Sequence, residues 1–471
     1  MAKGFIFKYD LCVACNACAA ACYLENKGEM PWRKVLTDNP EVYPGLPVHN
    51  ISMACNHCEH PVCMESCPAG AYSIDNEFNA VILDAAKCIG CNYCYWNCPY
   101  DAPQYNNGTG TIEKCHLCTD RLRSGILPAC TSACPTGALS YDEISDTSGE
   151  AYNINPNDLK PALNIINPRS TEAKPLVYPG NSTESVSTAE ATQKENSSKH
   201  EVSRKQKILQ PGVLSRVEVP GPVTDGRQKV KALCEWPLIL FTLLSSVLFS
   251  LSFSAWKGYE LISAPLYMAL LLAAALLSLF HLGKPLLFYR SLINLSSSPL
   301  SREIAAFSAF AVFSSLAMMF RLELLWMLAF ISGLLMLAAI DAVYVYSDKR
   351  PVIRYHNAQV FLTGLLLSSF LIAEPLPFIF IGVLKLLYLL VFKIIRLSSP
   401  PEKIFSLAYT GCLLYVSYSL FSPMPALKML IIFAILLVFE LGMRIIFYFD
   451  FSPVSLRFDF SRNKNKYEED N

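Results

Sequence analysis

Sixteen of the eighteen cysteines in this 471-residue chain lie before residue 135, in four groups of four. We call these groups quartets one to four: Cys12-Cys15-Cys18-Cys22, Cys55-Cys58-Cys63-Cys67, Cys88-Cys91-Cys94-Cys98 and Cys115-Cys118-Cys130-Cys134. Three thiolates at CxxCxxC spacing can hold three corners of an iron–sulfur cube, and a fourth just beyond them ligates the other cluster of a two-cluster unit. Quartets one and three have this spacing, and quartets two to four each end in Cys-Pro. The simplest count is therefore four [4Fe–4S] clusters.

Two other uses of clustered cysteines fit less well. Disulfides need an oxidising compartment, and residues 1–10 lack the apolar stretch of a signal peptide. Structural zinc sites take two ligand pairs separated by a longer finger, a layout that triple CxxCxxC runs do not match. The two remaining cysteines, Cys234 and Cys412, lie in apolar surroundings. We expect them to be inert small hydrophobic residues.

A repeated segment predicts the fold around the cysteines. Residues 67–73 (CPAGAYS) closely match residues 134–140 (CPTGALS), and short apolar runs precede quartets one and three. The unit reads as strand, cysteine loop, short helix, turn and strand, used more than once. We therefore expect an α+β ferredoxin-like four-cluster domain over residues 1–145, in which the clusters supply much of the stability.

Composition changes sharply after this domain. The chain is 52% hydrophobic with a formal net charge of zero, but these values are averages over a polar stretch and a strongly apolar one. Residues 146–232 have few large apolar runs, and 169–210 are rich in Ser, Thr, Asn, Glu and Lys. This composition is typical of an extended or flexible linker. The stretch up to residue 168 could instead lie extended against the cluster domain, and no periodicity decides between the two. Residues 451–471 read as a polar tail.

Residues 233–450 have the composition of a membrane domain. A helix needs about 20 apolar residues to cross the hydrocarbon core. Eight candidate spans follow one another, at roughly 236–256, 262–281, 304–320, 324–346, 357–374, 376–396, 405–421 and 425–447. A soluble helical domain would not run for about 200 residues with so few charges. We expect an all-α transmembrane bundle of eight helices embedded in the lipid bilayer.

The distribution of basic residues predicts the orientation of this bundle. Eight spans put the N-terminal domain and the C-terminus on one side, where most loop and tail Lys and Arg residues lie. The opposite side shows mainly Lys257, Arg321 and Lys428. The positive-inside rule then places the cluster domain in the cytoplasm, at the inner membrane of a prokaryotic cell.

Both parts of the chain resemble subunits of one enzyme family. Residues 12–142 resemble the iron–sulfur subunit of dimethyl sulfoxide reductases and related molybdopterin enzymes, through CNHCEHP at 55–61, CIGC at 88–91, CPYDAPQY at 98–105 and the long gap between Cys118 and Cys130. Residues 235–447 resemble the membrane anchor subunit of the same enzymes, through EWPL at 235–238, HLGKP at 281–285, LSREIA at 300–305 and ELGMR at 440–444. These segments cover about three quarters of the chain. Family members usually keep the two subunits separate and commonly work on the outer face, so this chain resembles a fusion of both.

The resemblance implies how the cysteines are shared among clusters. Set A would be Cys12, Cys15, Cys18 and Cys134; set B Cys115, Cys118, Cys130 and Cys22; set C Cys55, Cys58, Cys63 and Cys98; set D Cys88, Cys91, Cys94 and Cys67. Each fourth cysteine crosses to a neighbouring cluster, as in two-cluster ferredoxins. Some relatives lose the second cysteine of quartet three and hold a [3Fe–4S] cluster. Cys91 is present here, so four cubane clusters are expected.

The resemblance also implies a function. Menaquinol would be oxidised in the membrane, and electrons would pass through the clusters to a separate molybdopterin catalytic subunit of an anaerobic respiratory reductase. No segment is left to hold the molybdopterin, and no nucleic-acid partner is expected. An equivalent subunit of a polysulfide or tetrathionate reductase, delivering electrons to quinone, is the alternative. A redox-driven ion translocator would need charged residues deep within several spans, whereas the charges here are few and mostly near helix ends. Haem is not indicated, because CxxCH is absent and only His281 and His356 lie near helix ends.

Quinol oxidation releases two protons with two electrons, so its site needs a proton acceptor close to a cluster. Imidazole suits this role near neutral pH. His281 is the first candidate, since it follows an apolar run and precedes a Gly-Lys-Pro turn, although such a histidine can simply bond the last-turn carbonyls of its helix. The next candidates, chosen as ionisable groups in or beside the membrane, are Arg302, Glu303, Glu440 and Arg444.

Two acids of the expected spans, Glu440 and Asp341, also have structural interpretations. Glu440 and Arg444 lie four residues apart on one helix and could simply pair with each other. Asp341 is either a proton relay or a buried structural acid.

Overall fold

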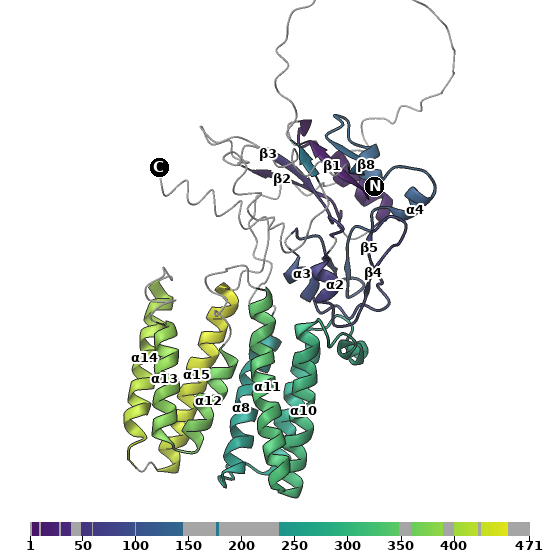
Figure 1. Ribbon diagram of the computed structural model, residues 1–471. Helices are drawn as coiled ribbons and strands as arrows, with labels where there is room; N and C mark the ends of the chain where they lie inside the picture. The colour runs from purple at the N-terminus through teal and green to yellow at the C-terminus, as the bar shows by residue number, and fades with distance from the viewer. Residues whose placement is uncertain are drawn as a thin grey trace, which may run out of the picture.

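The structure is a computed structural model that describes most of the cysteine-rich domain and most of the helical region (Figure 1). The described residues are 2–8, 11–27, 30–38, 49–58, 60–98, 100–144, 176–178, 235–347, 359–389, 400–422 and 425–450. The expected linker, except residues 176–178, and the expected tail lie outside these ranges, as do Cys234 and His356.

A three-stranded sheet ties together the two ends of the cysteine-rich domain. Strand β1 (Ala2–Lys8) pairs antiparallel with β8 (Leu139–Ile144), which places Phe7 opposite Leu139. Strand β9 (Leu176–Tyr178) pairs parallel with β1 on its other side. Because β1 precedes quartet one and β8 follows quartet four, this sheet brings the first and last quartets together.

The rest of the domain consists of short hairpins and short helices. The hairpins are β2 (Lys34–Asp38) with β3 (His49–Met53), β4 (Tyr72–Ile74) with β5 (Val81–Leu83), and β6 (Gln104–Asn106) with β7 (Thr111–Glu113). The helices are α1 (Ala17–Asn26), α2 (Val62–Glu65), α3 (Tyr93–Asn97), α4 (Thr119–Arg123) and α5 (Ala129–Ser132). Strands and short helices alternate around the cysteines, which confirms the predicted α+β ferredoxin-like domain. Its buried apolar clusters are small and contain many of the cysteines themselves.

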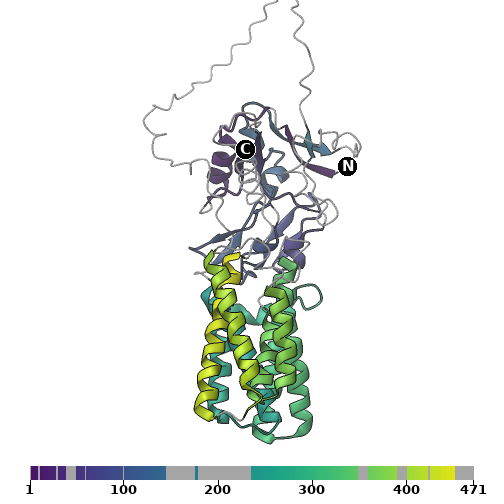
Figure 2. The same cartoon turned by 90° about the vertical axis from the view of Figure 1, so that its left-hand side faces the viewer.

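The second part of the chain is helical and forms one bundle, with the cysteine-rich domain at one end of it (Figures 1 and 2). Its elements are α8 (Trp236–Trp256), α9 (Ala264–Phe280), the short 3-10 helix η4 (Pro285–Leu292), α10 (Pro299–Phe320), α11 (Glu323–Ser347), α12 (Val360–Leu371), α13 (Pro375–Leu389), α14 (Pro400–Ser419) and α15 (Ala426–Asp450).

Fewer of these helices meet the criteria for a membrane crossing than the eight spans expected. Helices α8, α10, α11 and α15 are long and apolar enough, and α9 with η4 makes a fifth if this pair, bent by 96°, is one span. Helices α12, α13 and α14 are apolar but shorter in their described parts. Proline explains two of the breaks, because it cannot donate the helical hydrogen bond. Pro285 follows the end of α9, and Pro375 follows the turn after α12. Length and composition thus support four to five crossings.

Small polar residues connect helices α8 and α12 of the bundle. Ser246 and Ser250 of α8 donate hydrogen bonds to the carbonyl oxygens of Val360 (3.2 Å) and Gly364 (3.0 Å) on α12. A Cβ on Gly364 would approach the Leu337 side chain too closely. Small residues of this kind let membrane helices pack at short range. Helices α8 and α12 therefore pack closely against each other.

Candidate functional site

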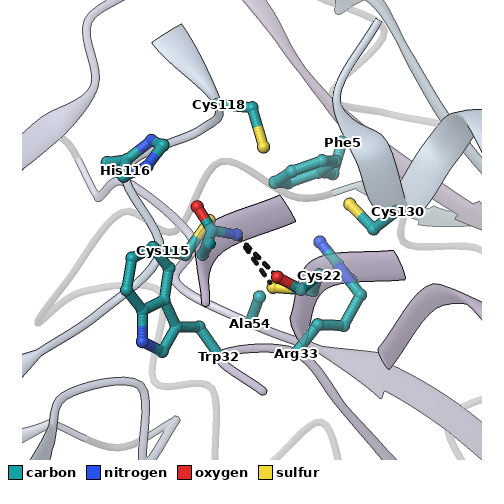
Figure 3. Close-up of a pocket in the computed structure, with 10 residues that line it drawn as sticks. Phe5, Cys22, Trp32, Arg33, Ala54, Cys115, His116, Cys118 and Cys130 are labelled. Carbon is teal, nitrogen blue, oxygen red and sulfur yellow. Dashed lines mark hydrogen bonds between the residues drawn. The ribbon is translucent and has the colours of Figure 1, made fainter. Parts of the chain in front are cut away.

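Three cavities in the cysteine-rich domain are each lined by four cysteines. Set B (Cys22, Cys115, Cys118 and Cys130) lines the first (Figure 3). Sets D and A line the other two. Each cavity combines three cysteines of one quartet with one of another, so the structure brings together the groupings that the resemblance implied.

The cysteines of set C also converge. Cys58 and Cys63 both lie close enough to Cys55 and Cys98 for their charges to interact. Burial first, and then the charge of Cys55 and Cys98, raise the pKa of the Cys58 thiol to about 12. Four thiols in such a position would repel one another if ionised without a cation. The donor set therefore suits a positively charged iron core.

The loops between these cysteines adopt an uncommon backbone conformation. Ala14, Asn16, His57, Asn92 and Leu117 each lie between two cysteines and have φ between 47° and 65°. A residue other than glycine in this left-handed region costs about 1–3 kcal/mol. The turns point successive cysteines toward a common centre, and ligand bonds can offset the strain.

Backbone donors face several cysteine sulfurs. The amides of Ala71 and Leu139 donate to Cys67 Sγ and Cys134 Sγ, each at 3.4 Å, and the amide of Ile112 donates to Cys88 Sγ at 3.5 Å. Hydrogen bonds to the charged form favour thiolate over thiol. Each of the three cavities is lined by four sulfurs drawn from two quartets, a donor set that suits an iron–sulfur cluster.

A bent segment of the helical region docks directly on the loop of set D. The amides of Gly283 and Lys284 donate to the carbonyl oxygens of Gly90 (3.3 Å) and Ile89 (3.1 Å), which lie between Cys88 and Cys91. The adjacent Leu282 is buried in an apolar cluster that includes four cysteines of quartets two and three. Segment 281–284 therefore contacts the loop of set D directly, and Asn294 adds a second contact by donating its Nδ2 to the carbonyl oxygen of Cys67 at 3.0 Å.

His281 begins this docking segment. It is the C-cap residue of α9 and is half-buried. Its Nδ1 is buried, and the Ser278 backbone, one turn earlier in α9, lies within reach of the ring. The residue thus sits one position from Leu282.

Arg302 and Glu303 lie on the same end of the bundle, at the start of α10. Arg302 is exposed, and its guanidinium donates to the carbonyl oxygens of Leu295 (3.1 Å) and Ser296. Glu303 is 7% exposed and lies near Tyr344 and Tyr448, whose hydroxyls bond each other.

Glu235, at the start of α8, completes this buried group beside Tyr344 and Tyr448. Burial raises the pKa of Glu235 to about 7. The Tyr93 hydroxyl of α3 donates to the carbonyl oxygen of Val343 on α11 at 3.2 Å. Helix α3, which also carries Cys94, therefore contacts α11 next to Tyr344. Glu235 was overlooked as an ionisable group in the sequence, although it opens the EWPL motif.

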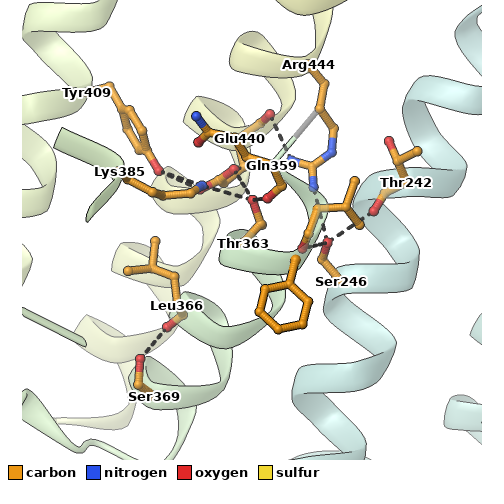
Figure 4. A network of polar contacts seen from close by, with 12 residues as sticks. Thr242, Ser246, Gln359, Thr363, Leu366, Ser369, Lys385, Tyr409, Glu440 and Arg444 are labelled. Carbon is orange, nitrogen blue, oxygen red and sulfur yellow. Dashed lines mark hydrogen bonds and ion pairs between the residues drawn. The ribbon is translucent and has the colours of Figure 1, made fainter. Parts of the chain in front are cut away.

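Glu440 and Arg444 belong to a different, fully buried network (Figure 4). Glu440 accepts hydrogen bonds from Thr363 Oγ1 (2.7 Å), Tyr409 and Lys385, and pairs with Arg444 at 3.2 Å. Arg444 also donates to Ser246 Oγ at 3.1 Å, and Lys385 to Thr363 Oγ1 at 2.9 Å. The network connects α8, α12, α13, α14 and α15 and includes no residue of segment 281–284.

This network corrects the expectation that the charges lie mostly near helix ends. Glu440 lies in the middle of α15, and Lys385, Glu440 and Arg444 are each 1% exposed. The two cations share one carboxylate, which favours the alternative that Glu440 and Arg444 pair. Asp341 accepts from the amides of Val360 and Phe361, each at 3.0 Å, and so caps the start of α12 as a structural acid.

Close backbone contact holds the docking segment in place. A Cβ on Gly283 would clash with the Gly110 carbonyl and lie 2.6 Å from the Tyr105 hydroxyl. A Cβ on Gly90 would lie 2.9 Å from Gly283 Cα and clash with the same carbonyl. Three glycines therefore meet where the two domains join.

Gly283→Ala should loosen this junction. Its new Cβ cannot fit against backbone, so the amide of Lys284 loses its partner and exchanges hydrogen at least about tenfold faster. Hydrogen exchange of the detergent-solubilised chain would measure this. Gly382→Ala is the matched control, since nothing lies within 4 Å of its Cβ. Unchanged exchange at Lys284 in the Gly283 variant would contradict the contact.

Sequence reasoning missed the buried cations Arg33, Lys114 and Lys385. Lys385 carried a usable signal, since a lone lysine inside an apolar span is a functional or pairing candidate by default. Arg33 and Lys114 carried none, because lysine and arginine in a short polar stretch are usually exposed.

The comparisons with known proteins concern the cysteine-rich domain. Residues 48–144 match the model of the 4Fe-4S dicluster domain. The chain is 35% identical over 166 residues to one component of the anaerobic dimethyl sulfoxide reductase of Escherichia coli K12, covering 32% of this chain and 80% of that protein. It is 31% identical over 173 residues to one component of the tetrathionate reductase of Salmonella typhimurium LT2, covering 36% and 68%. It is 35% identical over 152 residues to a thiosulfate reductase electron transfer subunit of Salmonella typhi, covering 29% and 73%.

Proposed function

Because the chain belongs, through its cysteine-rich domain, to the family of iron–sulfur electron-transfer subunits of molybdopterin reductases, we propose that it carries electrons between a membrane quinol and a separate molybdopterin subunit. The observation that supports this most is the docking of Gly283 and Lys284 on the loop between Cys88 and Cys91. Through this contact the helical region meets the cysteine loop of set D directly. One chain thus combines an entry point in the membrane with a path through the cysteine sets.

We propose four [4Fe–4S] clusters, held by sets A to D. When bound, each such cluster accepts and releases one electron. The cysteines hold the iron as thiolates, and the amides that face Cys67, Cys88 and Cys134 stabilise their negative charge. The polypeptide between the sets keeps water away, since most of these cysteines are buried.

The protein fully loaded with clusters should contain about 16 irons per chain. Iron analysis with spin quantification of the dithionite-reduced chain would measure this. A Cys91→Ser variant should lose iron from set D alone, because the other sets share no ligand with it. Clearly fewer irons in the intact, fully loaded chain would contradict the count of four.

We propose that His281 accepts a proton from menaquinol beside set D. Its half-buried ring lies one residue from the docked Leu282. An imidazole at this place can take a proton as the electron leaves toward the cysteines. Arg302 and Glu303 lie at the same end of the bundle and are secondary candidates for quinol binding. We assign Glu440 and Arg444 a structural role instead.

We propose that all eight helices cross the membrane and that the cysteine-rich domain lies in the cytoplasm, at the inner membrane. The excess of Lys and Arg in the loops and tail on that side supports this orientation. Protease treatment of sealed inside-out and right-side-out vesicles would test it. Cleavage within residues 146–232 only in inside-out vesicles is expected, and cleavage only in right-side-out vesicles would place the domain outside.

The terminal acceptor depends on the missing partner. The relatives are named for dimethyl sulfoxide, tetrathionate and thiosulfate reductases, and we favour the dimethyl sulfoxide type because the anchor motifs resemble it. A tetrathionate, thiosulfate or polysulfide complex, with electrons delivered to quinone, is the second candidate. Purification of the native complex, followed by identification of the large subunit and molybdenum analysis, tests the assignment. A complex without a molybdenum-containing subunit would refute it.

A further inference from the structure

Two buried cations lie among the cysteines and are not explained by ligand binding. Of the lysine and arginine side chains that the structure describes in the cysteine-rich domain, only Arg33 (2% exposed) and Lys114 (4%) are buried. Neither forms an ion pair with a described carboxylate. A buried cation without a carboxylate partner is costly, so its negative partner must be sought elsewhere.

Arg33 lies between sets A and B. It lines the cavity of set B, and Figure 3 shows its guanidinium end pointing toward Cys130. On the other side it donates to Ser52 Oγ at 3.1 Å, and this oxygen lies 3.3 Å from Cys18 Sγ of set A. The Phe5 ring covers the guanidinium at 4.4 Å. The cation therefore faces one cavity directly and the neighbouring set through one hydroxyl.

Lys114 lies between sets B and C. Its Nζ is 3.5 Å from Cys55 Sγ of set C and donates to the carbonyl oxygens of Cys115 (2.8 Å) and Val81. The ammonium group thus lies at the junction of the two sets, in contact with a sulfur of one and the backbone of the other.

We propose that Arg33 and Lys114 are positioning residues that raise the reduction potentials of the clusters on either side of them. Arg33 acts on sets A and B, and Lys114 acts on sets B and C. Set B is therefore influenced by both cations and set D by neither. This inference rests on the proposed function, since it requires the clusters to be present.

The physical reason is the charge of the reduced state. Each transfer removes one electron from the donor cluster and adds it to the acceptor, and neither cation changes its protonation. A fixed positive charge a few ångströms from a ligand sulfur, in a site shielded from water, favours the form with the extra electron. An exposed cation at a similar distance is screened by solvent and has little effect.

The test is a redox titration of the full chain, purified anaerobically in detergent and followed by low-temperature electron paramagnetic resonance. One Cys→Ser variant per set assigns the signals. Lys114→Met should lower the reduction equilibrium constants of sets B and C at least tenfold, a shift of about 59 mV for one electron. Arg33→Met should do the same to sets A and B. Set B should respond in both variants, and set D in neither.

Charge-retaining and exposed variants separate electrostatics from packing. Lys114→Arg and Arg33→Lys should keep potentials near those of the unmodified chain. Lys87→Met is the matched control, because Lys87 adjoins Cys88 but is 56% exposed and should shift nothing. Lys114→Gln repeats the neutral substitution if the methionine variant fails to bind clusters.

Three results would overturn the inference: potentials unchanged in the neutral variants, an equal shift in Lys87→Met, or cluster loss in every neutral variant with retention in the charged ones. The last would show that the cations serve folding alone. Absence of any cluster signal in the unmodified chain would instead refute the proposed function. The two failures are therefore distinguishable.

Discussion

Replacing His281 with alanine should abolish reduction of the clusters by a menaquinol analogue and leave their reduction by dithionite intact. Quinol must lose its protons as it gives up electrons, and His281 is the imidazole that the fold places beside the segment docked on set D. Removal of a positioned proton acceptor typically costs about 10²–10⁴-fold in rate. Stopped-flow absorbance of the clusters under anaerobic conditions measures both reactions.

Two controls make this result specific. His60→Ala removes an exposed histidine of the cysteine-rich domain and should leave both rates unchanged. Iron content must match that of the unmodified chain, so that a loss of rate is not a loss of clusters. Normal reduction by the quinol analogue in His281→Ala would remove this residue from the mechanism.

Replacing Glu440 with glutamine should strongly destabilise the helical domain. Glu440 is the shared partner of Lys385 and Arg444. Without its charge, two cations face each other in a buried site. Breaking a buried ion pair by removing one partner costs about 3–5 kcal/mol. Thermal unfolding in detergent, followed by circular dichroism, measures the loss.

A second substitution tests whether the charge is responsible. Glu440→Gln combined with Lys385→Met removes one cation with the carboxylate, so the double variant should be more stable than Glu440→Gln alone. Glu260→Gln is the control, because Glu260 pairs with Arg321 on the exposed surface, where a pair contributes about 0–1 kcal/mol. Equal stability of Glu440→Gln and Glu260→Gln would show that the network does not hold the helices together.

Much of the architecture could be predicted because its signals are local. Cysteine spacing predicts the ferredoxin-like domain, since three ligands of a cluster come from within one short loop. Hydropathy locates the helical region, and each expected span contains a helix. The number of crossings could not be predicted in the same way, because proline shortens α12 and bends the chain after α9, and hydropathy alone does not register these breaks.

The parts that could not be predicted depend on contacts between distant residues. Lys114 is 59 residues from Cys55, whose Sγ lies 3.5 Å from the lysine Nζ. Glu440 is 55 residues from Lys385 and 77 from Thr363. The pairing of Glu440 with Arg444 was an open alternative because the two residues share one helix. The second cation at Glu440, Lys385, could not be predicted, because its neighbours Thr363 and Tyr409, like Glu440, lie on other helices.

Electrons should enter the clusters from quinol within this one chain. To measure this, a menaquinol analogue is added to the oxidised, cluster-loaded full chain in lipid nanodiscs, without any partner subunit, and the electron paramagnetic resonance spectrum is recorded. Signals of reduced clusters should develop, and they should fail to develop with His281→Ala. Clusters of the unmodified chain that stay oxidised in excess quinol, yet are reduced by dithionite, would show that quinol does not deliver electrons to this chain.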